Sequence, residues 1–63
     1  MPLTRTDLSE LKRQLIAARS RVQDAKAKVR RGGDADLAER LHEISERLAN
    51  ELDYLDRLLA RQP

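Results

Sequence analysis

The sequence predicts an all-α fold, an antiparallel, coiled-coil-like hairpin of two helices joined by a short Gly-Gly turn. Apolar residues keep the alternating three- and four-residue spacing of a coiled-coil seam on both sides of the middle of the chain. The two glycines of the 63-residue chain stand together there, as Gly32-Gly33. If the chain reverses at these glycines, apolar residues fall opposite each other in pairs whose numbers add up to 66. The pairs are Leu8–Leu58, Leu11–Leu55, Ala18–Leu48, Val22–Ile44, Ala25–Leu41 and Val29–Leu37.

The first helix is expected over about residues 5–31. Thr4 and Asp7 have the spacing of a capping box, in which each side chain bonds the backbone of the other residue. Arg30 and Arg31 suit the negative end of the helix dipole. Gly32 is expected to take the left-handed conformation that ends many helices.

The turn is expected at 32–34 and the second helix over about 35–60. Asp34 or Asp36 can cap this helix, and Glu39 would complete a capping box with Asp36. A turn this short makes the helices antiparallel neighbours, so residues 1–63 are expected to form a single helical-hairpin domain. Glu51 interrupts the apolar seam of the second helix, where it would face Leu15.

A domain of this size has little core of its own, rarely worth more than ~3–5 kcal/mol. The chain has no cysteine, and its single histidine, His42, cannot make a zinc site without other strong ligands. We therefore expect no metal and no cofactor, and we expect self-association or a partner protein to add stability. No apolar run approaches the ~20 residues of a membrane span, and no apolar signal core follows the N-terminus, so a cytoplasmic location is expected.

Charge divides between the two halves of the chain, although the net charge is only +2. Residues 1–31 hold nine Lys and Arg against three Asp and Glu, whereas residues 34–63 hold four against eight. Attraction between the helices accounts for this division more simply than a basic helix that awaits an acidic partner.

The open end of the hairpin carries more apolar side chains than two helices can bury between them. Ile16, Leu52 and Leu59 lie beside the seam rather than in it, and an exposed apolar strip needs a cover. The alternative is that these side chains only widen the core of the hairpin. We favour a docking surface for a helical protein or a second copy. The expected partner-binding residues are Leu11, Leu15, Ile16, Leu52, Leu55 and Leu59.

One flank of the hairpin is basic, and it is formed by Arg21, Lys28, Arg40 and Arg47. Such a strip can follow a nucleic-acid backbone. However, Asp24 and Glu43 stand three and four residues from these cations, so pairing within each helix is expected to neutralise much of the strip. The only aromatic residue is Tyr54, which argues against base stacking.

Catalysis has little support in the sequence. Glu51-Leu52-Asp53 is similar to the E-L-D core of the small sporulation-type aspartyl-phosphate phosphatases, which are also helical hairpins. That motif has Ser and Gln just before the acid pair, where this chain has Ala49 and Asn50. We expect no enzymatic activity and no catalytic residues.

The turn also resembles that of a known family. Val29-Arg30-Arg31-Gly32-Gly33-Asp34-Ala35 is similar to the helix–turn–helix junction of the YscE-like co-chaperones of bacterial type III secretion, and the resemblance extends over roughly residues 15–60. It implies a small cytoplasmic virulence and protein-transport factor without cofactor or catalysis. Such a protein docks a helical-repeat, tetratricopeptide-like chaperone and helps to keep the needle subunit unpolymerised. The alternative is a homodimeric four-helix-bundle RNA-binding regulator of the Rop type, which requires a stable dimer and salt-sensitive binding.

Overall fold

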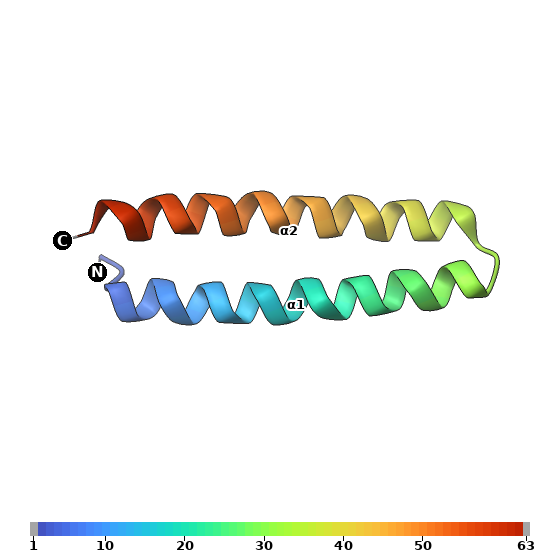
Figure 1. Ribbon diagram of the computed structural model, residues 1–63, viewed down its shortest axis with the longest axis horizontal. Helices are drawn as coiled ribbons and strands as arrows, with labels where there is room; N and C mark the ends of the chain where they lie inside the picture. The colour runs from blue at the N-terminus through green and yellow to red at the C-terminus, as the bar shows by residue number, and fades with distance from the viewer. Residues whose placement is uncertain (1, 63) are drawn as a thin grey trace.

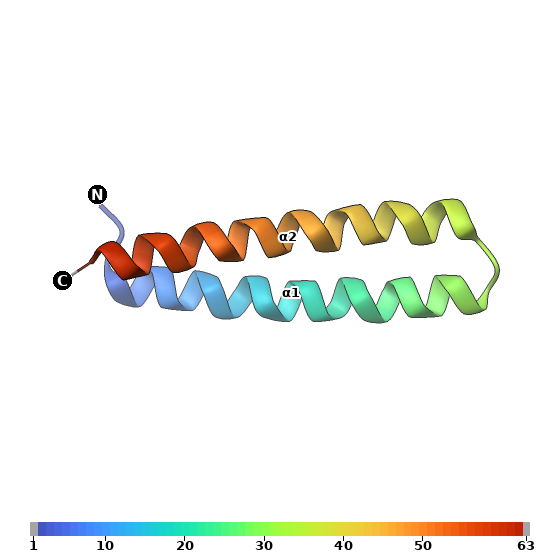
Figure 2. The same cartoon turned by 45° about the horizontal axis from the view of Figure 1, so that its top comes forward.

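The computed structural model describes residues 2–62, which form a helical hairpin (Figure 1). Helix α1 spans Arg5–Arg31, helix α2 spans Ala35–Arg61, and each has 27 residues. The start of α1 and the end of α2 lie together at one end of the hairpin, and the turn lies at the other (Figure 1). The ribbons draw together toward the turn in Figure 1 but separate toward it in the rotated view (Figure 2), so the helices cross at a small angle. The predicted all-α hairpin is therefore confirmed.

The predicted capping box is present at the start of α1. The Thr4 hydroxyl accepts a hydrogen bond from the Asp7 backbone N–H at 3.1 Å, and the Asp7 carboxylate accepts one from the Thr4 backbone N–H at 3.0 Å. Hydrogen bonds from the backbone and then from the side chain of Thr4 lower the pKa of Asp7. These contacts set the first residue of α1 where the sequence predicts it.

The turn differs from the prediction in which glycine is left-handed. Gly32 keeps a right-handed φ of −79°, whereas Gly33 has a φ of +86°. Gly33 N–H bonds the Arg30 carbonyl at 3.1 Å, and Asp34 N–H bonds the Val29 carbonyl at 3.4 Å. This pair of bonds is the Schellman ending of a helix, which places its left-handed residue one position after the cap. The prediction for Gly32 is wrong by one residue, because Gly32 is the C-cap of α1 and keeps a helical conformation.

Asp34 is the N-cap of helix α2. The Asp34 carboxylate accepts a hydrogen bond from the Leu37 backbone N–H at 3.0 Å, and Asp36 stands in the first helical turn. The choice that the sequence left open between these two aspartates falls on Asp34. Since Asp34 also closes the Schellman ending of α1, one residue joins both helix ends.

The seam between the helices is rotated from its predicted position on α2. Leu37 is 44% exposed and Ile44 is 48% exposed, whereas Ala38 is 3% and Ser45 is 2% exposed. The predicted facing pairs that include Leu37 and Ile44 are therefore wrong. The inward row of α2 runs one residue later than predicted, and its members are Ala38, Ser45, Leu52 and Leu59.

Two features of the sequence explain this rotation. The predicted seam would have placed the Glu51 carboxylate against Leu15, and desolvation of an unpaired charge costs several kcal/mol. The rotated seam brings Leu52 inward and leaves Glu51 exposed. Ala38 and Ser45 are also small, so they let the two backbones approach closely.

Candidate functional site

The hairpin has two broad faces, and one of them is tied together by polar contacts between the helices. Lys12 Nζ lies 2.6 Å from Asp56 Oδ1, and Lys26 Nζ lies 3.2 Å from His42 Nδ1. Gln23 Nε2 lies 3.5 Å from Ser45 Oγ. We call this side the polar face. The residue numbers of each pair add up to 68.

The opposite side is apolar along most of its length. At 100° per residue, the rows of α1 and α2 that point away from the polar contacts lie on this same side of the antiparallel pair. Leu11 is 37% exposed, and Leu37 and Ile44 are exposed further, at 44% and 48%. We call this side the apolar face, and its members are Leu11, Ala18, Ala25, Leu37, Leu41, Ile44, Leu48, Leu55 and Leu58.

Cations border the apolar face on both helices. Arg21 and Lys28 follow its edge on α1, and Arg40 and Arg47 follow its edge on α2; all four are exposed. Within residues 2–62, none of these four forms an ion pair with a carboxylate. The pairing within each helix that the sequence predicted for Asp24 and Glu43 is therefore not formed. The apolar face keeps a positively charged rim.

The six residues expected to bind a partner do not form one surface. Leu11 lies on the apolar face, and Leu55 lies half-buried along its centre. Leu15, Leu52 and Leu59 are half-buried in the seam. Ile16 is 49% exposed, but it lies on the side of the polar face. The assignment of these residues to partner binding stays a prediction.

The two most exposed members of the apolar face, Leu37 and Ile44, were missed as candidate binding residues. The seam pattern predicts both of them between the helices, as part of the core. The signal that could have found them is Glu51, which belongs to the same row of α2. A row that carries a charge at its third position is poorly suited to lie in the seam.

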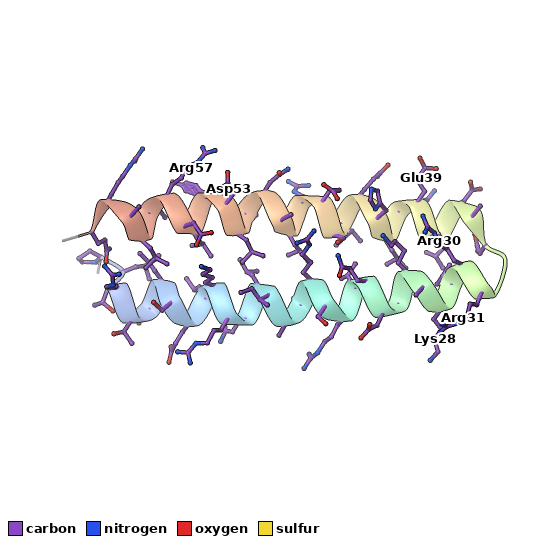
Figure 3. The ribbon with its side chains drawn as sticks, in the orientation of Figure 1. Lys28, Arg30, Arg31, Glu39, Asp53 and Arg57 are labelled. Carbon is purple, nitrogen blue, oxygen red and sulfur yellow. The ribbon has the colours of Figure 1, made fainter. Side chains whose placement is uncertain are left out.

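Several charged side chains, one of them from the rim of the apolar face, point into solvent. Figure 3 shows Lys28 and Arg31 directed away from α2, and Glu39, Asp53 and Arg57 directed away from α1. Asp53, from the triplet similar to the phosphatase motif, accepts a hydrogen bond from Arg57 at 2.7 Å. Among the residues described, no cluster of three or more His, Asp or Glu side chains could hold a metal ion.

Neither helix of the described chain is long and apolar enough to cross a membrane. Comparisons of the sequence and structure with protein-family models, with curated proteins and with solved structures find no match.

Proposed function

We propose that this chain is a protein-binding hairpin that packs its apolar face against the helices of another protein. The observation that supports the proposal is the exposure of Leu11, Leu37 and Ile44 together on one face, at 37%, 44% and 48%. Contiguous apolar surface bordered by charge is typical of protein interaction sites. The leucines between these three residues give the face the apolar spacing that a partner helix fits.

The resemblance at the turn supports a specific version of this function. In that version the chain is a cytoplasmic co-chaperone of a type III secretion system, and its partner is a tetratricopeptide-like chaperone that holds the needle subunit. A helical-repeat protein presents rows of helices, which suit a face built from two parallel rows of leucine and isoleucine. No reaction or cofactor takes part.

Co-expression with the candidate chaperone and needle subunit tests this function, and two isoleucines provide matched variants. Ile44 and Ile16 are equally exposed, at 48% and 49%, but they lie on opposite sides of the hairpin. We expect Ile44→Asp to abolish co-purification and Ile16→Asp to preserve it. Retention of the complex by both variants, or failure of the unmodified chain to bind, would contradict the proposal.

A second candidate function is RNA binding in the manner of the Rop regulators. The observation that favours it is the rim of four exposed cations, which form no ion pair with any described carboxylate. Phosphate contacts of this kind make affinity fall steeply with salt. Replacement of Arg21 and Arg47 by Gln should weaken the binding of a hairpin RNA and flatten its salt dependence. Absence of binding at about 50 mM salt, where such contacts are strong, would exclude this function.

A further inference from the structure

We infer that a second copy of this chain covers the apolar face and forms an antiparallel four-helix bundle with its turns at opposite ends. The inference rests on the proposed function, because both use the same face. It identifies the molecule that covers the face when no other partner is bound, and it assigns the symmetry of the resulting dimer.

The direction of the seam supports more than two helices. In a two-helix coiled coil, the residues at alternating three- and four-residue spacing point straight at the other helix. Here the inward rows are shifted to one side, so Leu11, Leu37 and Ile44 turn outward. The row that holds Leu41, Leu48 and Leu55 points between the neighbouring helix and the apolar face. Helices of a four-helix bundle point such positions at the central axis, between their two neighbours.

The exposed area of the hairpin matches the amount that a dimer would bury. The chain exposes 5166 Å², whereas a compact monomer of its 7.2 kDa mass exposes about 4,100 Å². The excess, about 1,000 Å², is close to the ~800 Å² that each partner contributes to a stable interface. The hairpin measures 48 by 18 Å along its two longest dimensions, so its broad face has room for such a contact.

The apolar face is self-complementary about a two-fold axis perpendicular to the helices. If that axis passes at the level of Ala18 and Leu48, each of these residues meets its own counterpart in the second copy. Leu41 then lies level with Leu55 of the second copy, and Leu37 lies near Leu58 of the second copy. Leu37, Leu41 and Leu48 of α2 therefore meet apolar residues of the second copy, whereas Ile44 lies level with Leu52 of the second copy, beside its Glu51.

Charges at the rim favour this axis over the other two-fold arrangement. With the turns at opposite ends, Lys28 lies within one residue of the level of Asp7 of the second copy, and Arg47 lies within a helical turn of Glu51 of the second copy. With the turns at the same end, α1 would lie over α2 of the second copy. Arg21 would then face Arg47, and Lys28 would face Arg40, which places like charges together along the whole rim.

Cysteine cross-linking tests both the dimer and its symmetry, since the chain has no cysteine of its own. In the proposed dimer the two copies of Leu37 lie at opposite ends, about 33 Å apart along the bundle at 1.5 Å per residue. A short thiol cross-linker should therefore leave Leu37→Cys unlinked with itself. It should link Leu37→Cys to Leu58→Cys when the two variants are mixed. Self-linking of Leu37→Cys would overturn the antiparallel arrangement.

Sedimentation equilibrium of the unmodified chain tests the dimer separately. We expect twice the 7.2 kDa chain mass at high concentration, and we expect Ile44→Asp to reduce it to the chain mass while Ile16→Asp keeps the dimer. A single-chain mass at all concentrations would overturn the inference. A monomer that still binds the chaperone through Ile44 would leave the proposed function intact, and a dimer that never binds the chaperone would refute only that function.

Discussion

The side chains on the two faces of the hairpin differ in the contacts that they make within the chain. On the polar face, lysines of α1 reach across to α2, and Lys12 and Lys26 contact Asp56 and His42 within the chain. On the apolar face, Leu11 of α1 and Leu37 and Ile44 of α2 stand exposed, and the cations at the rim form no ion pairs with described carboxylates. The polar face makes contacts between the two helices of the hairpin, whereas the apolar face keeps large apolar side chains exposed.

This difference follows from a small rotation of α2. The rotation removes Glu51 from the seam and brings Leu52, Ala38 and Ser45 into it. It also turns the row of Leu37 and Ile44 outward. The same row therefore carries both the charge that cannot be buried between two helices and the apolar side chains that remain exposed.

The largest expected effect comes from the seam, on which both faces depend. Leu52→Asp places a charge among half-buried apolar side chains. An unpaired buried charge costs at least ~3 kcal/mol, which is comparable with the whole stability of so small a domain. We expect most of the helical signal in circular dichroism to be lost. Asn50→Asp, two residues away and exposed, should change the helical signal little. An equal loss of signal in both variants would contradict the placement of Leu52 in the seam.

A second test concerns the close approach of the helices near the turn. Ala38 is only 3% exposed, so Ala38→Leu should overpack the seam and lower the stability by ~1–3 kcal/mol. Ala27→Leu is the matched control, because Ala27 is exposed on α1. Urea unfolding of the two variants gives the comparison. If Ala38→Leu were as stable as its control, the rotated seam would be incorrect.

The polar face offers a smaller effect. Lys12 and Asp56 approach to 2.6 Å with side chains that are 37% and 53% exposed. Exposed ion pairs contribute about 0.2–1 kcal/mol, and salt screens them. A double-mutant cycle with Lys12→Ala and Asp56→Ala should give a coupling in that range that declines as salt is added. No measurable coupling at low salt would show that the Lys12–Asp56 ion pair does not stabilise the hairpin.

The smallest effect is expected at the capping box. It lies at the open end of the hairpin and makes no contact between the helices. Hydrogen bonds from Thr4 lower the pKa of Asp7 in the folded chain. A lowered folded pKa stabilises the fold above the ordinary pKa of aspartate, and that stability is lost as the pH falls through the folded value. Acid titration of the melting temperature should be shallower for Asp7→Asn than for the unmodified chain. Identical titrations would argue against the box.

The fold follows from local patterns in the sequence. Thr4 and Asp7 define the start of α1 by their spacing, the glycine pair defines the turn, and the apolar spacing defines two helices of the right length. These features depend on residues close together in the chain, so the sequence alone specifies them.

The candidate site follows less directly, because it depends on contacts between the helices. A row of apolar residues specifies an amphipathic helix but leaves open which edge of that row turns inward. That choice depends on the sizes of Ala38 and Ser45 and on the charge of Glu51, set against the residues of α1 that face them. The exposed positions of Leu37 and Ile44 are consequences of this choice, and so were not predicted.

Thermal unfolding of Ile44→Asp and Ile16→Asp at the same high protein concentration tests most directly whether the apolar face is covered by a second molecule. The two side chains have the same chemistry and nearly the same exposure in the single hairpin, at 48% and 49%. If a second copy covers Ile44, Ile44→Asp should melt well below the unmodified chain, while Ile16→Asp melts close to it. Equal melting temperatures for the two variants would show that the apolar face meets only water, and would contradict the account.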